Sequence, residues 1–525
     1  MSIINGGIFM SHSPALGSTL THTKIRTPEN VSEFSGMCSV CTVNCIGSCE
    51  IGLSAVRGSE AIYPYDADKN QFASEKNYPL DFSQININGR CFGAVGCSEN
   101  ADEATYPKVD ISISFGINNK VKMKAPFILP AMAKLNWKDY YAGAAMAGVL
   151  AVIGEDVVAK DKNLILENGK VLSSPLIEEM VNSFRQYYRG YGDIILQANY
   201  DDEGLGVLDY AITTLKVKTV ELKFGQAAKG IQGMGRVKSI DDALKFQKMG
   251  YLIYPDPSDP EIAENYINGR GQIFEKIGKL PMWDEEKLIN RVGELRSLGA
   301  EHICFKTGPF DPKDLIRIIK IASEAKIDLI TFDGAGGGTG NSPVKMMNEW
   351  GIPTVYLESM IHDILKRMSC KNYSLPQIAI AGGFATEDQI FKGLALGSPY
   401  ISFVATGRAA MAAAMSGKQI GDLLEAGNIP KEYQRFGITR EEIFSEIKEL
   451  KLHYGNTEEI STGAIGVYSY INRISAGIKQ LMALNRKFEL KHIDRKDIVP
   501  LTELAAQVTG LDTYDDIFLR EIEKI

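Results

Sequence analysis

Short apolar runs alternate with longer helical stretches between about residues 125 and 415, and this alternation predicts the fold. Continuous apolar strands separated by helices are typical of a parallel sheet that helices cover. Eight strand candidates favour a (β/α)8 TIM barrel, an α/β fold, over an open sheet. The candidates are residues 127–130, 149–153, 193–197, 219–223, 302–306, 328–332, 377–381 and 400–404.

The segments that flank this pattern differ from it in composition. Residues before the barrel are first rich in Ser, Thr, Gly and His and then rich in Cys, with short strand-like pieces such as residues 50–58. The stretch between the fourth and fifth strands is long for one crossover connection, which predicts an insertion at about 230–290. We expect an extended arm at 1–30, a Cys-rich iron–sulfur domain at 31–120, the barrel at 121–425 and a helical extension at 426–525.

Composition restricts the class of protein. The chain has 525 residues, of which 45% are hydrophobic and 23% charged, as in an ordinary globular protein. Its net charge of −8 argues against a nucleic-acid partner. No apolar run reaches the roughly 18 residues of a membrane helix, and the start of the chain lacks the pattern of a secretory signal. We therefore expect a cytoplasmic protein without a membrane or nucleic-acid partner.

A glycine-rich loop follows the sixth predicted strand. Residues 333–343 read Asp-Gly-Ala-Gly-Gly-Gly-Thr-Gly-Asn-Ser-Pro. Such a loop lets the backbone approach a flat or anionic ligand closely, with main-chain N–H groups facing it. The alternative is a surface turn without a ligand.

Two further glycine motifs end the last two strands. Gly382-Gly383 follows the seventh strand, and Gly407-Arg408 follows the eighth and precedes an Ala-rich helix. Glycine N–H groups at this place in a barrel, next to a helix N-terminus, typically bind a phosphate monoester, and Arg408 can add a charged fork. The alternative is that these glycines only permit tight turns.

Three lysines are expected on the same rim of the barrel, namely Lys223, Lys229 and Lys306. Together with a phosphate site they suit a dianionic substrate beside a flavin, although a solvated rim is the simpler alternative. Lys306 or Gln197 would lie near the pyrimidine edge of the flavin, where a donor stabilises the reduced anion. No Gly-x-Gly-x-x-Gly opens a helix after a strand, so a nicotinamide-dinucleotide domain is not indicated.

Six of the eight cysteines cluster before the barrel, which favours metal ligation over disulfides in a reducing compartment. Four thiolates with glycines nearby suit an iron–sulfur cluster, and the spacing lacks the usual pair of Cys-x2-Cys knuckles of a zinc site. A structural zinc site and a disulfide remain the alternatives. The pattern also resembles the [4Fe–4S] domain of molybdopterin oxidoreductases, in which Cys91 would be the last ligand. The candidate ligands are Cys38, Cys41, Cys45, Cys49 and Cys91, with Cys97 close by.

These motifs together resemble the FMN-binding synthase domain of glutamate synthase, over roughly residues 125–415. The matching pieces are residues 221–229, 333–343, 381–388 and 404–408. The resemblance implies a (β/α)8 barrel that binds FMN, adds ammonia to 2-oxoglutarate and reduces the resulting 2-iminoglutarate to L-glutamate.

The resemblance also implies roles for single residues. It implies that Lys229 contacts a substrate carboxylate and that Lys306 and the loop Gly336 to Thr339 contact FMN. It also implies that the glycine motifs after the seventh and eighth strands bind the FMN phosphate. The catalytic candidates are Lys223, Lys229 and Lys306. The FMN-binding candidates are Ala131, Met132, Gln197, Lys223, Lys306, Asp333, Gly336, Gly337, Gly338, Thr339, Gly382, Gly383, Gly407 and Arg408.

The chain departs from this family in three places. It begins Met1-Ser2-Ile3 without the family's glutamine amidotransferase domain, it has no cysteine after Cys370, and the segment after Lys229 is short. We therefore expect free ammonia or a separate glutaminase, electrons from ferredoxin or a separate reductase subunit through the N-terminal cluster, and a homo- or hetero-oligomer. The alternatives are an FMN enzyme for a different carboxylate and a non-catalytic electron-transfer subunit.

Overall fold

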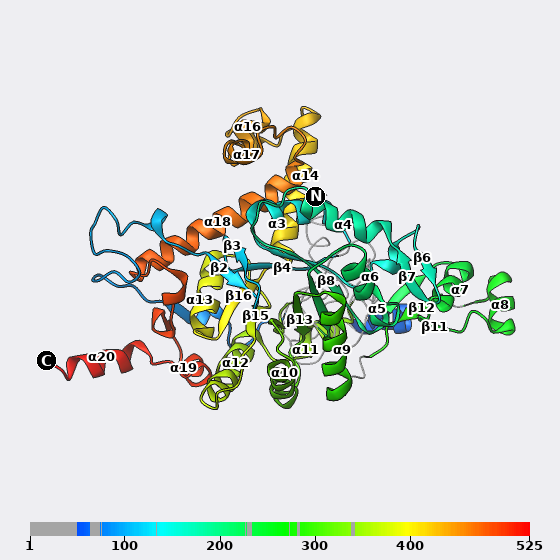
Figure 1. Ribbon diagram of the computed structural model, residues 1–525, viewed down its shortest axis with the longest axis horizontal. Helices are drawn as coiled ribbons and strands as arrows, with labels where there is room; N and C mark the ends of the chain where they lie inside the picture. Colours follow the sequence, from blue (N-terminus) through cyan, green and yellow to red (C-terminus); the bar gives the residue numbers. More distant parts are fainter. Residues whose placement is uncertain are drawn as a thin grey trace.

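Eight parallel strands close into a barrel in the computed structural model, which describes residues 50–62, 74, 76–132, 134–225, 227, 234–271, 273–280, 284–337 and 342–525 (Figure 1). The barrel closes where Val404 pairs with Phe127. All eight predicted strands belong to it, which confirms the predicted fold. They are β4 (Phe127–Met132), β5 (Leu150–Ile153), β8 (Ile194–Ala198), β9 (Thr219–Lys223), β13 (His302–Thr307), β14 (Leu329–Asp333), β15 (Gln377–Ala381) and β16 (Ile401–Ala405).

The apolar runs can form strands because helices cover the outer face of the barrel and side chains fill its interior. Phe305, Phe332 and Phe403 are fully buried on three of the strands. The covering helices are α3 (Trp137–Ala147), α4 (Pro175–Arg185), α5 (Tyr200–Gly204), α6 (Val207–Thr213), α9 (Glu285–Leu298), α10 (Pro312–Glu324), α11 (Val344–Glu349), α12 (Thr354–Ser369), α13 (Glu387–Gly397) and α14 (Arg408–Glu425), and a hairpin of β6 (Ile165–Glu167) and β7 (Lys170–Ser173) stands beside α6.

A small antiparallel sheet with two helices lies between β9 and β13 in the sequence. Its strand order is β10-β12-β11, and in Figure 1 it projects beside α5. Its elements are β10 (Met234–Val237), α7 (Ile240–Lys248), β11 (Leu252–Tyr254), α8 (Pro260–Ile267) and β12 (Phe274–Ile277).

The amino-terminal end of the barrel is closed by a hairpin of β2 (Ile113–Phe115) and β3 (Val121–Met123). The Phe115 ring lies 4.8 Å from the His302 ring at the start of β13, and the Ile117 N–H donates to Asp328 Oδ1 at 2.8 Å. Because this end is plugged, the opposite, carboxyl-terminal end is left for chemistry.

The described part of the chain before the barrel differs from one expectation. Residues Glu50–Arg57 form helix α2, not a strand-like piece, because alternation over so short a run does not distinguish the two structures. Strand β1 (Ile85–Ile87) pairs antiparallel with β17 (Ile498–Pro500). Single 3-10 turns complete the chain at Gly58–Ile62, Phe82–Gln84, Tyr106–Lys108, Val158–Lys160, Leu490–His492 and Arg495–Asp497.

The C-terminal part is helical. Its long helix α18 (Thr462–Leu484) packs across α14 and α3, while α16 and α17 project from the body above it and α20 leads away at the far end (Figure 1). Among the described residues, no helix is long and apolar enough to cross a bilayer. The remaining helices are α15 (Lys431–Gln434), α16 (Arg440–Ile443), α17 (Ile447–Tyr454), α19 (Glu503–Thr509) and α20 (Tyr514–Ile522).

Candidate active site

Polar side chains from four barrel strands gather at the open end of the barrel, which we call the mouth. Lys223 and Lys306 are register partners on β9 and β13, and Gln197 and Glu221 are register partners on β8 and β9. Residues two apart in a strand share a face, so Glu221 and Lys223 project on the same side. The mouth residues Gln197, Glu221, Lys223, Lys306 and Asp333 are all buried.

Lys223 forms an ion pair with Glu155, which lies just beyond the end of β5. Strand β8 separates β5 from β9 in the barrel, so this pair spans a neighbouring strand end. The Lys223 side chain is only 4% exposed and the Glu155 side chain 18%. A charge this deeply buried needs such a partner, because desolvation of an isolated ammonium group is costly.

Lys306 lies near a second carboxylate. Its Nζ is 3.9 Å from Asp333 Oδ2 at the end of β14. The same Oδ2 accepts a hydrogen bond of 3.0 Å from the Ala227 N–H. Asp333 therefore joins the loop after β9 to the lysine of β13 and fixes the side of the mouth on which the glycine-rich loop begins.

Glu221 and Gln197 form the deeper layer of the mouth. Gln197 Nε2 donates to Glu221 Oε1 at 2.5 Å. Burial raises the pKa of the Glu221 carboxyl, and the nearby Lys306 and Lys223 oppose that rise. The buried Gln197 Oε1 has no hydrogen-bond partner among the described residues. A buried acceptor without a partner is unfavourable, so a ligand that donates here would be stabilised.

An acidic group borders the mouth next to Glu155. Asp202, at the start of α5, is buried, and its Oδ2 accepts from the Asp156 N–H at 3.0 Å and the Asn199 N–H at 3.3 Å. Burial, together with the Asp156 carboxylate, raises the pKa of Asp202 to about 8. Lys276 of β12 reaches Asp156 Oδ1 at 3.2 Å, which ties the small antiparallel sheet to this rim.

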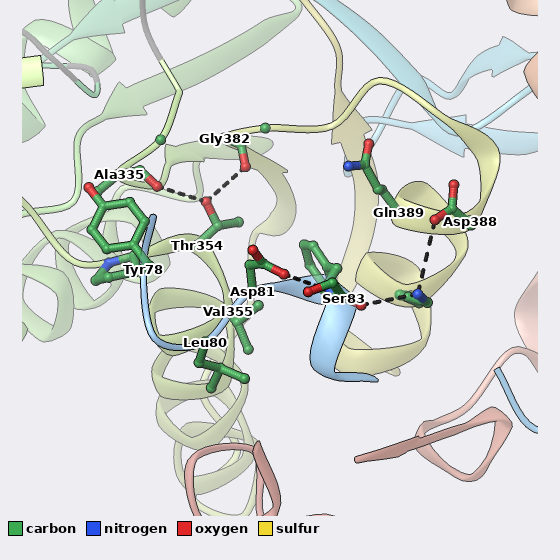
Figure 2. A pocket seen from close by; sticks show the side chains of 15 residues that line it. Tyr78, Leu80, Asp81, Ser83, Ala335, Thr354, Val355, Gly382, Asp388 and Gln389 are labelled. Atoms are coloured by element: carbon green, nitrogen blue, oxygen red, sulfur yellow. Dashed lines mark hydrogen bonds and ion pairs between the residues drawn. The ribbon is translucent and has the colours of Figure 1, made fainter. Parts of the chain in front are cut away.

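The loops after β14 and β15 are held together by Thr354, at the start of α12. Its hydroxyl lies 2.8 Å from the Gly382 carbonyl oxygen and 3.3 Å from that of Ala335 (Figure 2). A Cβ on Gly382 would come within 2.4 Å of the Thr354 hydroxyl, and Gly382 and Gly383 have φ of +123° and +92°. Glycine is therefore required at both positions by conformation, and at Gly382 also by space.

The loop after β16 contacts the loop after β14, and we call the group of Gly336, Gly382, Gly383, Gly407 and Arg408 the pocket corner. Arg408 Nη2 donates to the Gly336 carbonyl oxygen at 3.3 Å. Gly407 precedes α14 without a side-chain cap, so N–H groups of the first helical turn remain without a side-chain acceptor there. A Cβ on Gly407 would lie 3.1 Å from Pro130 of β4, which puts this turn against the strand that carries Ala131 and Met132.

A pocket of about 340 Å³ opens between these glycine loops and the segment of residues 78–83. Gly336, Gly382 and Gly383 line it together with Tyr78 and Asp81, and Figure 2 shows Tyr78, Asp81 and Gly382 around the pocket. Lys392 of α13 holds the segment by donating to the Phe82 carbonyl oxygen at 3.0 Å. The glycine loops after β14 and β15 thus form part of the wall of this pocket.

The structure brings most of the candidate residues into two adjoining groups. Gln197, Lys223, Lys306 and Asp333 form the mouth, whereas the glycines and Arg408 form the pocket corner. Gly337 lies at their junction, because a Cβ there would come within 2.6 Å of Asp333 Oδ1 and 2.9 Å of the Gly382 Cα. Ala131 and Met132 end β4, where the Met132 carbonyl oxygen accepts from the Gly154 N–H at 2.9 Å.

Several candidates lie outside the described residues, namely Lys229, Gly338, Thr339, Cys38, Cys41, Cys45 and Cys49. Cys91 is described and carries an exposed thiol that is in no disulfide. Within the described ranges, no group of three or more His, Cys, Asp or Glu side chains is placed to hold a metal ion.

Three residues of the site were missed by sequence reasoning. Glu155 could have been found, because it is a carboxylate just beyond the second strand. Glu221 could have been found from its position two residues before Lys223 on a buried strand. Thr354 carries no such signal, since its role depends on where α12 begins relative to two loops distant in sequence.

Comparison with known proteins finds similarity to glutamate synthase over part of the chain. Residues 279–418 match the conserved region in glutamate synthase. A glutamate synthase large subunit-like protein of Bacillus subtilis, YerD, is 23% identical over 189 residues, which are 36% of this chain and 32% of that protein. The matched region thus spans about a third of that relative's length.

Two solved structures are similar to the chain at low sequence identity. A flavocytochrome b2 variant with sulfite bound matches with a TM-score of 0.45 and 14% identity, over 84% of this chain and 81% of the other. A mandelate oxidase variant with benzaldehyde matches with a TM-score of 0.42 and 13% identity, over 79% and 86%.

Proposed function

We propose that this protein is an FMN-dependent oxidoreductase of the glutamate synthase type, which reduces 2-iminoglutarate, formed from 2-oxoglutarate and ammonia, to L-glutamate. One arrangement carries the proposal. The two buried lysines Lys223 and Lys306 stand side by side at the mouth of a closed barrel, next to a glycine-walled pocket. The match of residues 279–418 to the conserved region in glutamate synthase supports it.

The residues present fit FMN at both of its ends. At the phosphate end, Gly382, Gly383 and the uncapped start of α14 offer backbone N–H groups, and Arg408 stands beside them. At the ring end, the buried Gln197 Oε1 lacks a partner among the described residues and would accept from a ring N–H. FMN bound there would supply hydride transfer to an electrophilic carbon.

The lysines would bind and orient the substrate. Lys223 and Lys306 each lie near a carboxylate of the protein, which holds the lysine side chain in place. A dicarboxylate that binds here would therefore meet ammonium groups whose positions are already fixed. Lys229, which the resemblance assigns to a substrate carboxylate, would add a further positive charge. Fixing the carboxylates places the imine carbon and removes part of the entropic barrier.

The reaction also consumes protons. Overall, 2-oxoglutarate, ammonium, two electrons and two protons give L-glutamate and water. Glu221, whose pKa burial raises, can hold a proton at the base of the mouth. The hairpin of β2 and β3 plugs the opposite end of the barrel, so substrate would enter and product leave through the mouth.

Electrons would reach the site from outside the barrel. We propose that Cys91 and cysteines among Cys38, Cys41, Cys45 and Cys49 hold an iron–sulfur cluster of the [4Fe–4S] type, which accepts single electrons from ferredoxin or a separate reductase subunit. Ammonia would be free or come from a separate glutaminase. A visible absorption spectrum with flavin peaks and the broad shoulder of a brown iron–sulfur protein would support this pair of cofactors. A colourless protein that contains zinc would contradict it.

The decisive experiment measures L-glutamate. Purified protein would be supplied with FMN, ammonium, 2-oxoglutarate and a chemically reduced low-potential donor. We expect glutamate to form, and to form far more slowly in Lys306→Met. The matched control Lys313→Met, at an exposed position of α10, should retain wild-type turnover. Oxaloacetate and pyruvate in place of 2-oxoglutarate would reveal a different carboxylate substrate. Flavin reduction without turnover of any 2-oxo acid would overturn the substrate assignment.

A further inference from the structure

Helix α18 of the C-terminal part is fixed against the barrel by unusually close backbone contacts. A Cβ on Gly466 of α18 would come within 2.4 Å of the Ala413 carbonyl oxygen in α14. A Cβ on Gly417 of α14 would come within 2.5 Å of the Thr462 carbonyl oxygen. Small residues on both helices let them approach, so α18 has little freedom to shift along α14.

One side chain of α18, Tyr470, contacts the residues next to both glycine motifs, Gly382-Gly383 and Gly407-Arg408. The Tyr470 hydroxyl donates to the Ala385 carbonyl oxygen at 2.7 Å. The same hydroxyl oxygen lies 3.0 Å from Thr406 Oγ1, which in turn lies 3.3 Å from the Phe384 carbonyl oxygen. Phe384 and Ala385 directly follow Gly382-Gly383, and Thr406 directly precedes Gly407-Arg408.

A second contact holds the helix that follows the first motif. Arg473, one turn beyond Tyr470, pairs with Glu387 at the start of α13 at 2.7 Å. A Cβ on Gly477 would come within 2.4 Å of Glu387 Cγ, so α18 and the start of α13 also touch closely. The two loops and the start of α13 therefore take their relative positions from one helix.

We propose that Tyr470 is a positioning residue that fixes the loops around the phosphate group of the flavin. Helix α18 thus contributes to cofactor binding. The inference rests on the proposed function, because it takes the pocket corner as the FMN phosphate site. Backbone N–H groups bind a phosphate well only when their directions are fixed in advance. Tyr470 fixes the loops after β15 and β16 relative to each other without touching the ligand.

The test compares FMN with riboflavin, which lacks the phosphate. Binding of each to the full-length apoprotein would be followed by quenching of flavin fluorescence. For Tyr470→Phe, which removes only the hydroxyl, we expect FMN to bind about three- to tenfold more weakly, as for the loss of one hydrogen bond. Riboflavin affinity should not change.

The matched control is Tyr468→Phe. Tyr468 is on the same helix and buried, but its hydroxyl lies near Asn472 and Glu449 and away from the two loops. We expect it to leave the affinity ratio of FMN to riboflavin at the wild-type value. Thermal unfolding of each variant reports any general loss of stability.

The outcomes separate this inference from the proposed function. Equal weakening of FMN and riboflavin in Tyr470→Phe would mean a merely structural tyrosine and would overturn the inference. Unchanged FMN binding in Tyr470→Phe would overturn it as well, with the proposed function intact. A wild-type protein that binds no FMN would overturn both.

Discussion

Lys306 lies beside Lys223 in the register of two parallel strands, and each ammonium group faces a different carboxylate. Two adjacent buried cations would repel each other strongly in a site of low polarity. Glu155 and Asp333 each offset part of this repulsion, so the two lysines can lie close together. The mouth is therefore a balanced network, and removing one of its charges should affect both function and stability.

Glu155→Gln tests this balance. The variant leaves the buried Lys223 facing a neutral amide, and we expect its free energy of unfolding to fall by about 1–3 kcal/mol. Chemical denaturation at neutral pH measures the loss. The control is Glu301→Gln, which removes an exposed pair with Lys218 at 2.8 Å and should change the free energy by less than about 1 kcal/mol. Equal effects in both variants would contradict a special role for the mouth pair.

Gly383→Ala tests the pocket corner. Gly383 has a φ of +92° with open space around it, so alanine adds strain of about 1–2 kcal/mol but no clash. We expect lower stability and weaker FMN binding, measured by thermal unfolding and flavin fluorescence. Gly169→Ala is matched, since Gly169 has a φ of +74° and open space in the remote turn between β6 and β7. It should lose similar stability and keep its FMN affinity.

The pH dependence of stability should reveal Asp202. Its folded-state pKa of about 8 exceeds the unfolded value near 4, so the folded protein binds more protons than the unfolded chain between these pH values. Stability from this group is therefore present at low pH and is lost as pH rises towards 8, by at most about 1.4 kcal/mol per pH unit.

Asp202→Asn removes this titration, so its unfolding free energy should depend less on pH between 5 and 8 than that of the wild type. Denaturant titrations at several pH values measure the difference. Asp256→Asn is the control, because hydrogen bonds from Ser258 and Gln247 lower the pKa of that exposed carboxyl. Its contribution is lost only below the unfolded pKa, and the slope between pH 5 and 8 should match the wild type.

Cys91→Ser tests the proposed cluster. If Cys91 is a ligand, the variant should hold less iron and lose the brown absorbance, since a thiolate ligand is replaced by a poor one. Iron analysis and the visible spectrum measure this. Cys370→Ser changes the other exposed thiol of the described residues and should leave both unchanged. Full iron content in Cys91→Ser would remove Cys91 from the ligand set.

The barrel could be predicted from the sequence because each strand contains a run of apolar residues, and the helices between strands show the periodicity of a helix that is buried on one face. Continuous runs such as residues 150–153 have no solvated face, and a parallel sheet covered by helices provides that environment. The mistaken strand at residues 50–58 shows the limit of the same reasoning, since a short alternating run is compatible with a helix.

The site could be predicted only where its residues lie at or just after strand ends in sequence. Lys223 and Lys306 lie in the last residues of their strands and Gly382 directly follows its strand, and the barrel geometry then brings them together. Thr354 and Tyr470 could not be predicted, because each acts through backbone carbonyl groups of loops far away in the chain. Such contacts depend on how helices pack, and the pattern of apolar and polar residues within one segment does not show how distant segments pack.

The ladder between β1 and β17 joins residues 85–87 to residues 498–500. During synthesis the first of these strands leaves the ribosome long before the second exists. It must wait, unpaired, while the whole barrel is made and folds, since domains generally fold in the order of their synthesis. Completion of the molecule is therefore a late event, set by the arrival of its last strand.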